Sequence, residues 1–416
     1  MNALSRTSLF AYGLFGLPLA LVALPIYVYV PQFYAEHFGL SLSAIGVALL
    51  LARVLDAFID PAIGWWIDHS KAKGGFQQPV LLSLPLLAFG FHGLFQPPEF
   101  ARAMPMGWFL LTLMLTYTGF SLASIAHQSW GAALTQAVSQ RSRLTAAREA
   151  CGLAGVILAA GMQQTLAPGW LSPVFILMLF LSAIVLLRLA DRPVLAKLVA
   201  PKSEGLAALM MPFRGRRFRW LFTAFVVNGV AAAIPATLFL FFAKDYLQLA
   251  HYSGLFLLLY FVAAATSMPL WVMLAKRHGE ARAWLIGMLV AVLAFIWVLV
   301  LDSGAATGFG VICMLSGVAL GADLALPPAL LTAVIANAGH SGQREGAYFG
   351  AWNWATKMNL ALAAGISLPL LQRLGYTPGV VDAGAMQALL LAYAVVPCLL
   401  KIVAALIVWR APLRDL

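Results

Sequence analysis

The stretch DRPVLAKLVAPKSEGLAALMMPFRGRR, residues 191–217, decides the fold. It is the longest polar interval in a chain of 416 residues that is 62% hydrophobic and only 10% charged. Soluble domains carry roughly a quarter charged residues, so a soluble protein of this composition would leave much apolar surface in water. The composition therefore predicts an all-α polytopic membrane protein.

Apolar segments lie on both sides of this interval. A helix needs about 20 apolar residues to cross a bilayer. We expect twelve transmembrane helices, at residues 8–34, 43–67, 79–96, 106–136, 145–167, 171–190, 218–243, 252–275, 283–301, 308–336, 346–372 and 385–409. The interval 191–217 is then a cytoplasmic loop between two six-helix bundles, residues 1–190 and 218–416. The first apolar segment is too long for the core of a cleavable signal peptide, so we expect it to be a span.

The 26 lysines and arginines are unevenly distributed. Most fall in the loops on the side of the two termini, with a cluster at 188–219, and few fall on the opposite side. The positive-inside rule then predicts cytoplasmic N- and C-termini in the plasma (inner) membrane. Because the basic loops are explained as topology signals, we expect no nucleic-acid partner; contact of the cluster with anionic lipid is an alternative. The basic residues inside predicted spans are Arg53, Arg148, Lys357 and Lys401.

Two groups of six spans joined by a long cytoplasmic loop are the plan of a major facilitator carrier. In that fold two pseudo-symmetric halves bind the solute near the midplane. Helix count alone does not identify this fold, since other proteins also have twelve spans.

The second predicted span carries charge in RVLDAFIDPAIGWWID, residues 53–68. Arg53, Asp56 and Asp60 share one face of a helix. Charge that faces lipid costs at least a few kcal/mol, so this face is predicted to look inward. Two carboxylates one turn apart are best tolerated with a cation between them, which makes Asp56 and Asp60 a candidate Na⁺ or H⁺ site. A structural ion pair between Arg53 and Asp56 is the alternative.

Further polar residues inside the spans are candidate ligands, among them Ser124 for the cation and His127 and Gln128 for the solute. In the fourth span Ser121, Ser124 and Gln128 follow one stripe, with His127 beside it. His127 is suited to bind solute or relay protons, although a packed histidine that donates to a backbone carbonyl is an equal rival.

The fifth and eleventh spans carry the remaining candidates. Arg148 and Glu149 are placed at the start of the fifth, where Arg148 either reaches the cavity or forms a surface ion pair. In the eleventh, Lys357 follows Asn353 by four residues, so both face one way. The solute candidates of this span and its neighbour are Asn353, Trp354, Lys357 and Asp323.

For two charged residues, Lys357 and Asp68, the sequence does not decide which group each one pairs with. A buried Lys357 ammonium needs an anionic partner, either Asp323 in the tenth span or a group of the solute. Asp68 is placed at the end of the second helix, where it either pairs with basic groups on a neighbouring helix in one state of the transport cycle or is an ordinary loop charge.

The sequence contains no motif that indicates an enzyme. HExxH, GxSxG and P-loop motifs are absent, the seven histidines are scattered, and the three cysteines have no disulfide or zinc spacing. We expect no catalytic residue, no cofactor, and no metal beyond a possible Na⁺ at Asp56 and Asp60.

Three segments resemble the glycoside–pentoside–hexuronide:cation symporters, the melibiose permease family. They are RVLDAFIDPAIGWWIDHS (53–70), RSRLTAARE (141–149) and SGQREGAYFGAWNWATKMNLALAAGISLPLLQRLGY (341–376). The resemblance implies the major facilitator fold and alternating access. It also implies that Asp56 and Asp60 are cation-site aspartates, and that Arg148 and Lys357 are charged residues near the cavity.

Some positions depart from the family pattern. Ile59 stands where the family has a cation-site asparagine, and Ser124 stands where it has the aspartate of helix four. Gln128 lies near its sugar-stacking aromatic, and Pro18 near its sugar-binding aspartate. Na⁺ prefers a cage of oxygen ligands whereas a proton needs one carboxylate, so the changes favour H⁺ slightly.

We therefore predict a monomeric secondary transporter: a cation-coupled symporter of a small organic solute, glycosidic or anionic. The same family includes lysophospholipid carriers, so an amphipathic lipid is an alternative solute. A non-transporting assembly or accessory protein is a further alternative, and it predicts that the buried acids tolerate neutral replacement.

Overall fold

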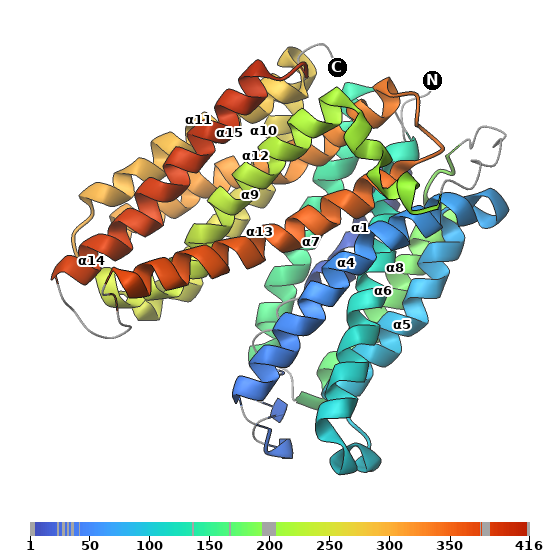
Figure 1. The fold of residues 1–416 in the computed structure, drawn as a ribbon, viewed down its shortest axis with the longest axis horizontal. Helices are drawn as coiled ribbons and strands as arrows, with labels where there is room; N and C mark the ends of the chain where they lie inside the picture. Colours follow the sequence, from blue (N-terminus) through green and yellow to red (C-terminus); the bar gives the residue numbers. More distant parts are fainter. Residues whose placement is uncertain are drawn as a thin grey trace. The chain divides into compact units, whose positions relative to one another are not determined.

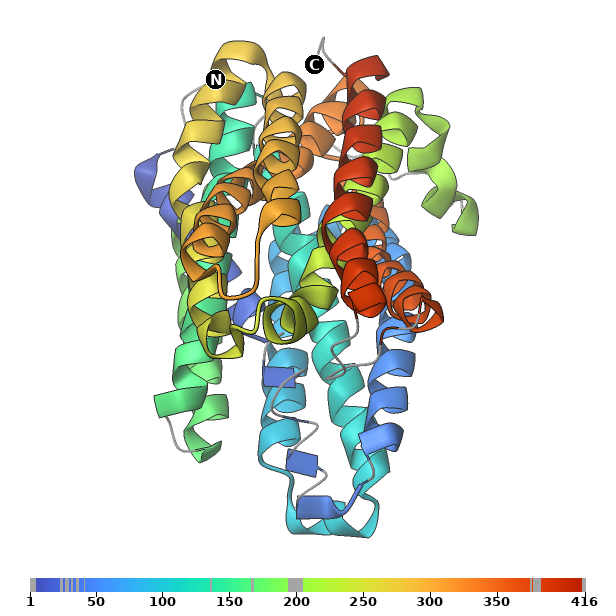
Figure 2. The ribbon, with the colours of Figure 1, turned by 90° about the vertical axis from the view of Figure 1, so that its left-hand side faces the viewer.

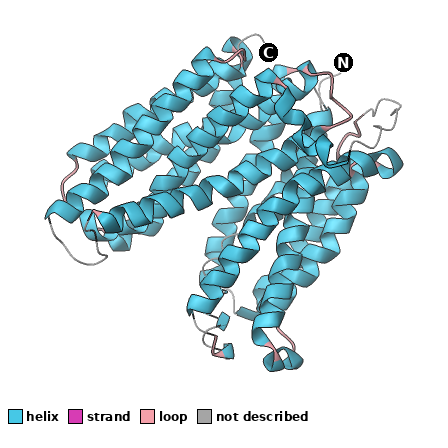
Figure 3. Ribbon diagram, in the orientation of Figure 1, coloured by secondary structure: helices cyan, strands magenta, loops and turns pink. Residues whose placement is uncertain are grey.

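The structure is a computed structural model that describes residues 5–22, 25–26, 30, 33–34, 37–40, 42–134, 137–165, 168–193, 205–374, 376 and 383–413. These residues are helical almost throughout, and none of them is in a strand (Figure 3). The predicted all-α architecture is confirmed. Parts of the predicted span 8–34 and residues 194–204 of the predicted loop lie outside the described residues.

The chain divides into two compact units, Met1–Pro212 with Ile335–Trp354, and Phe213–Val334 with Ala355–Leu416. The first unit holds the helices coloured blue to green in Figure 1. They are α1 (Arg6–Leu14), α2 (Gly16–Leu21), α4 (Leu42–Gly74), α5 (Gln77–Phe95), α6 (Pro105–Leu134), α7 (Val138–Thr165) and α8 (Leu171–Leu189). Helices α5 and α6 form a hairpin whose glycines allow close packing: a Cβ at Gly90 would lie 2.5 Å from the Thr116 nitrogen.

The second unit holds the later helices, which Figure 2 shows from a second direction. They are α9 (Arg216–Phe241), α10 (Ser253–His278), α11 (Glu280–Phe295), α12 (Ala306–Asn337), α13 (Glu345–Arg373), α14 (Ala383–Leu390) and α15 (Val396–Arg410). The end of α12 and the start of α13 belong to the first unit. A 3₁₀ helix, Gly205–Arg214, precedes α9.

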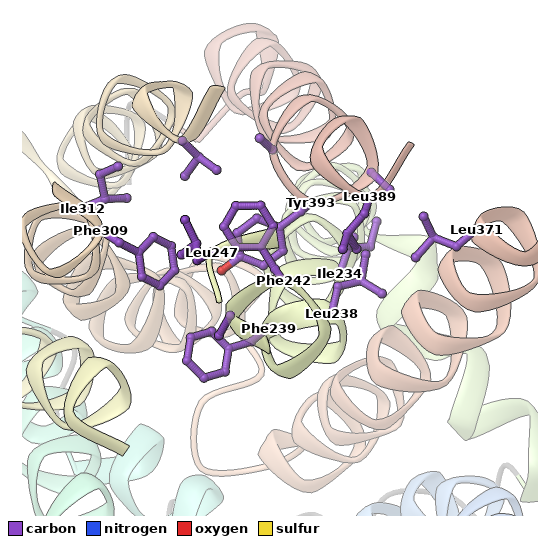
Figure 4. Packing of buried hydrophobic residues seen from close by; sticks show 14 of the residues in the cluster. Ile234, Leu238, Phe239, Phe242, Leu247, Phe309, Ile312, Leu371, Leu389 and Tyr393 are labelled. Atoms are coloured by element: carbon purple, nitrogen blue, oxygen red, sulfur yellow. The ribbon is translucent and has the colours of Figure 1, made fainter. Parts of the chain in front are cut away.

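The core of the second unit combines aliphatic and aromatic side chains (Figure 4). Two π-helical turns, Phe242–Tyr246 and Leu391–Val395, bring Phe242 and Tyr393 together. Their rings stack with centroids 4.0 Å apart and planes 3° apart. This contact joins α9 to the segment α14–α15.

The number of helical segments agrees with the prediction. With α1–α2 counted as one segment and α14–α15 as another, the described residues form twelve. Among them, eight helices are long and apolar enough to cross a membrane. Helices α4, α7 and α13 are not among the eight because they carry the charged residues that the sequence places inside spans.

Two predicted boundaries are wrong. Helix α4 continues to Gly74, so Asp68 does not end it. Residues 70–73, Ser-Lys-Ala-Lys, can continue a helix. The helix ends before Gly75, whose φ of 63° is favourable for glycine. Helix α7 begins at Val138, so Arg148 and Glu149 lie about three turns inside it rather than at its start.

Candidate functional site

The acidic pair of α4 is buried. Asp56 and Asp60 have almost no exposed surface, which confirms that their face looks inward, and Arg53 is half-buried beside them. The Ser121 hydroxyl of α6 donates a 2.8 Å hydrogen bond to Asp56 Oδ1. A hydroxyl donor stabilises the ionised carboxylate. Ser124 is buried three residues further along α6. The hydrogen bond therefore joins a buried carboxylate of α4 to a hydroxyl of α6.

Glycines bring the start of α13 against α4 next to this pair. A Cβ at Gly64 would lie 2.1 Å from the Gly346 carbonyl oxygen. A Cβ at Gly350 would lie 2.7 Å from the Asp60 carbonyl oxygen. Such distances leave no room for a side chain, so the two backbones touch directly. The backbone of Asp60 is thus part of the α4–α13 contact.

Asp68 binds the N-terminus of α13. Its Oδ1 accepts from the Gly346 N–H and its Oδ2 from the Ala347 N–H, both at 2.8 Å. The first N–H groups of a helix have no partner within the helix, and the helix dipole favours an anion there. The buried Asp68 carboxylate therefore caps a neighbouring helix and is not an ordinary loop charge.

His127 is packed against α1. Its Nε2 lies 2.8 Å from the Tyr12 carbonyl oxygen, and the Tyr12 hydroxyl donates to the His127 carbonyl at 3.1 Å. The Tyr12 and Phe15 rings lie against the imidazole. The geometry matches the packed-histidine alternative, while a role of His127 toward solute stays a prediction.

Arg148 pairs with its neighbour Glu149 through Nε and Nη2. The guanidinium also acts electrostatically on the Tyr12 hydroxyl. Its side chain is 12% exposed, so the pair is not a surface pair. Tyr12 therefore connects the two solute candidates Arg148 and His127 within the first unit.

Two predicted solute ligands, the amide side chains of Gln128 and Asn353, lie next to each other. Gln128 Nε2 of α6 lies 3.4 Å from Asn353 Oδ1 of α13, and Asn353 Nδ2 donates to the Phe349 carbonyl at 3.0 Å. Trp354 follows and is half-buried. Lys357 lies one turn further along α13 and is buried.

The remaining candidate, Asp323, has partners in the second unit. Its Oδ2 lies 2.6 Å from Lys401 Nζ of α15, and its Oδ1 accepts from the Trp284 indole N–H of α11 at 2.8 Å. Sequence reasoning named Lys357 as a possible partner and missed Lys401. The available signal was that Lys401 also lies inside a predicted span and so also needs an anion.

Ionisable groups buried among long apolar helices are typical of membrane proteins that move ions or solutes. The fold agrees: the Escherichia coli fucose:proton symporter FucP has a TM-score of 0.69 at 15% identity and covers 96% of this chain and 98% of its own. A bacterial homologue of the iron transporter ferroportin gives 0.71 at 16% identity, over 98% and 99% of the two chains. The chain has the major facilitator fold.

Residues 9–415 match the MFS/sugar transport protein family, and the chain belongs to that family. A glucuronide carrier protein homolog of Escherichia coli is 27% identical over 92% of this chain and 87% of its own length. The isoprimeverose transporter of Lactiplantibacillus pentosus is 24% identical over 70% of this chain. The chain matches only 64% of that transporter's length.

Proposed function

We propose that this protein is a cation-coupled symporter of a glycoside or a glycoside-like anion, working by alternating access. The observation that carries the proposal is the acidic pair Asp56–Asp60, buried in a membrane helix with Ser121 bound to Asp56. Ionisable groups at such positions mark ion or substrate pathways. The relatives, named as a glucuronide carrier homolog and an isoprimeverose transporter, support a sugar-containing solute.

The cation binds at Asp56 and Asp60, with Ser124 as a further ligand. We favour H⁺ over Na⁺, since a proton needs one carboxylate and Ile59 removes an oxygen ligand that the family provides. No other cofactor is needed. The structural relative FucP, which has the same fold, is named as a proton symporter. A proton is therefore a coupling ion that this fold can use.

The solute ligands of this proposal are the polar residues that the sequence places inside the fourth, fifth and eleventh spans. Gln128 and Asn353 offer amide donors and acceptors for hydroxyls, and Trp354 offers an aromatic face. Arg148 and Lys357 suit a carboxylate such as that of a glucuronide. His127 binds the solute, either directly or through its contact with Tyr12. Linkage requires that cation and solute each raise the affinity for the other.

The protein acts in the inner membrane as a monomer with cytoplasmic termini and has no catalytic activity. Its halves are residues 1–190 and 218–416, joined by 191–217. Asp68 serves as a gating contact, because its bonds to α13 must break if α4 and α13 separate during transport. The names of the relatives favour a glycoside over a lysophospholipid, and they are carriers rather than assembly factors.

Transport by reconstituted protein tests the coupling. Asp56→Asn and Asp60→Asn should abolish accumulation of solute against its gradient, while equilibrium exchange of solute continues. Exchange is the internal control, because it shows that each variant folds and binds. Accumulation at the wild-type level by both variants contradicts the coupling role of Asp56 and Asp60.

A solute panel tests the substrate class. Thermal unfolding is followed with glucuronides, neutral glycosides and lysophospholipids, with and without Na⁺, at acidic and neutral pH. We expect stabilisation by a glucuronide or glycoside that grows with acidity and does not need Na⁺. Stabilisation by lysophospholipids alone replaces the glycoside proposal with the lipid one.

A further inference from the structure

The second unit buries a separate ion pair, which the cation site of α4 does not use. Asp323 and Lys401 lie 2.6 Å apart, and their side chains keep only 10% and 11% of their surface exposed. Trp284, which is fully buried, donates to the other carboxylate oxygen. Within the part of the chain that the structure describes, Asp323 is the one hydrogen-bond acceptor recorded for the Lys401 ammonium.

Stability alone does not explain this pair. Two charges lose their hydration when they are buried, and their attraction often only balances that loss, so two apolar residues would hold α12 and α15 together as well. Inside a membrane segment the cost is higher still, and ionisable residues there mark pathways.

The carboxylate has further titratable neighbours. On α10, the Tyr260 hydroxyl lies within electrostatic range of Asp323 and of the Cys313 thiol on α12. Tyr393 interacts in turn with Cys313 and Tyr260, and Cys398 of α15 with Lys401. Helix α11 contributes the indole of Trp284. The pair therefore interacts with one titratable group of α10, Tyr260, and one of α15, Cys398.

Helix α12 is weakened at this point. Pro327 and Pro328 lie inside it, four residues after Asp323 and Leu324. A proline has no N–H, so the carbonyls of Asp323 and Leu324 lack their usual helical donors. A bend at this position costs few hydrogen bonds, and it moves the carboxylate relative to α15.

We propose that Asp323 and Lys401 form a second proton-binding site, located in the C-terminal bundle and distinct from Asp56 and Asp60. While α12 and α15 are in contact, the ammonium stabilises the ionised carboxylate. When they part, an ionised Asp323 without its counterion is strongly disfavoured, so its Oδ2 takes a proton from water. Lys401 stays charged and turns its N–H groups to water. The proton returns to water when the pair re-forms.

Infrared difference spectra between neutral and acidic pH test this on the purified full-length protein, without any need for transport. We expect the wild type to gain a carboxylic-acid C=O band that Asp323→Asn/Lys401→Met lacks. Asp56→Asn is the matched control, because it should retain this band. Since the readout is proton binding, it is independent of whether the symport proposal holds.

Two outcomes overturn the inference. Superimposable spectra of the wild type and a folded double variant show that Asp323 takes up no proton and that the pair is only structural. Should the double variant aggregate, Asp323→Glu decides, because it keeps the carboxylate and the ion pair but moves the band frequency if this group is protonated. Unmoved bands in Asp323→Glu then contradict the site.

Discussion

At the scale of single residues, the Asp56 carboxylate depends on the Ser121 hydroxyl, which donates to it at 2.8 Å. A hydrogen bond to a charged group contributes about 1.5–3 kcal/mol. Because this bond stabilises the ionised carboxylate rather than the protonated one, Ser121→Ala should lower the proton concentration for half-maximal transport by about tenfold. Initial transport rates measured over a range of pH and of Na⁺ concentration check this.

The matched control for this prediction is Ser129→Ala. Ser129 is fully buried on the same helix, and its hydroxyl has no hydrogen-bond partner among the described residues. The two variants remove the same atom, but only one removes a bond to Asp56. Equal cation dependence of Ser121→Ala and Ser129→Ala would falsify the role given to Ser121.

His340 makes the stability of the segment before α13 depend on pH. Burial lowers the pKa of His340, Arg344 lowers it further, and Glu345 opposes both. The unfolded chain, with a histidine pKa of about 6.5, then binds protons at a higher pH than the folded chain does. The stabilisation is present above about pH 6.5 and is lost as the pH falls through the lowered pKa.

His340→Gln should therefore reduce the loss of thermal stability between neutral and mildly acidic pH. Glutamine does not titrate but can still bond the Tyr348 hydroxyl, which lies 2.9 Å from His340 Nδ1. Melting temperatures of both proteins at several pH values give the comparison. A parallel decline of the two curves shows that other groups set the acid sensitivity.

At the scale of helices, the contact between α4 and α13 is set by glycine. Gly64→Ala places a Cβ 2.1 Å from the Gly346 carbonyl, so the helices must move apart. Overpacking of this kind typically costs 1–3 kcal/mol, about the loss we expect in the free energy of unfolding. Gly46→Ala on the same helix meets nothing within 4 Å and should gain up to about 1 kcal/mol from helix propensity. Thermal unfolding that ranks the two variants alike is the contrary result.

The cap on α13 can be tested at the same contact. Asp68→Ala leaves the Gly346 and Ala347 N–H groups without their acceptors, at a cost of about 1 kcal/mol for the helix end. Amide hydrogen exchange at 346–347 should become faster. Asp68→Asn keeps one acceptor oxygen and should give a smaller change. Unchanged exchange in Asp68→Ala means that the helix start is held by other contacts.

The α4–α13 contact and the Asp68 cap show which features could be predicted from the sequence and which could not. Periodicity correctly placed Asp56 and Asp60 on a buried face, because that needs only the geometry of one helix. It did not reveal that Asp68 caps α13, since the N–H groups involved are 278 and 279 residues away and carry no side-chain signal. For the same reason the sequence could not decide the partner of Asp323: Lys357 and Lys401 both fit the charge, and only the packing selects Lys401.

At the scale of the whole molecule, composition and span length were sufficient for the all-α class and the twelve segments, because a bilayer allows few alternatives to long helices. The charged helices α4, α7 and α13 were harder to predict as spans from composition. Their spans are interrupted by residues such as Arg148 and Lys357, whose cost is met by contacts that only the folded chain provides.

The orientation of the whole chain in the membrane is the remaining prediction, since it rests on the basic residues alone. Cys151, Cys313 and Cys398 are first replaced, and single cysteines are then introduced as Arg277→Cys and Asp302→Cys, both at exposed positions. In intact cells a membrane-impermeant maleimide should label Asp302→Cys, on the predicted outer side. It should label Arg277→Cys only after the membrane is broken, because that residue lies among the basic loops expected in the cytoplasm. The reverse pattern would place both termini outside and leave the positive charges on the side where the membrane potential opposes them.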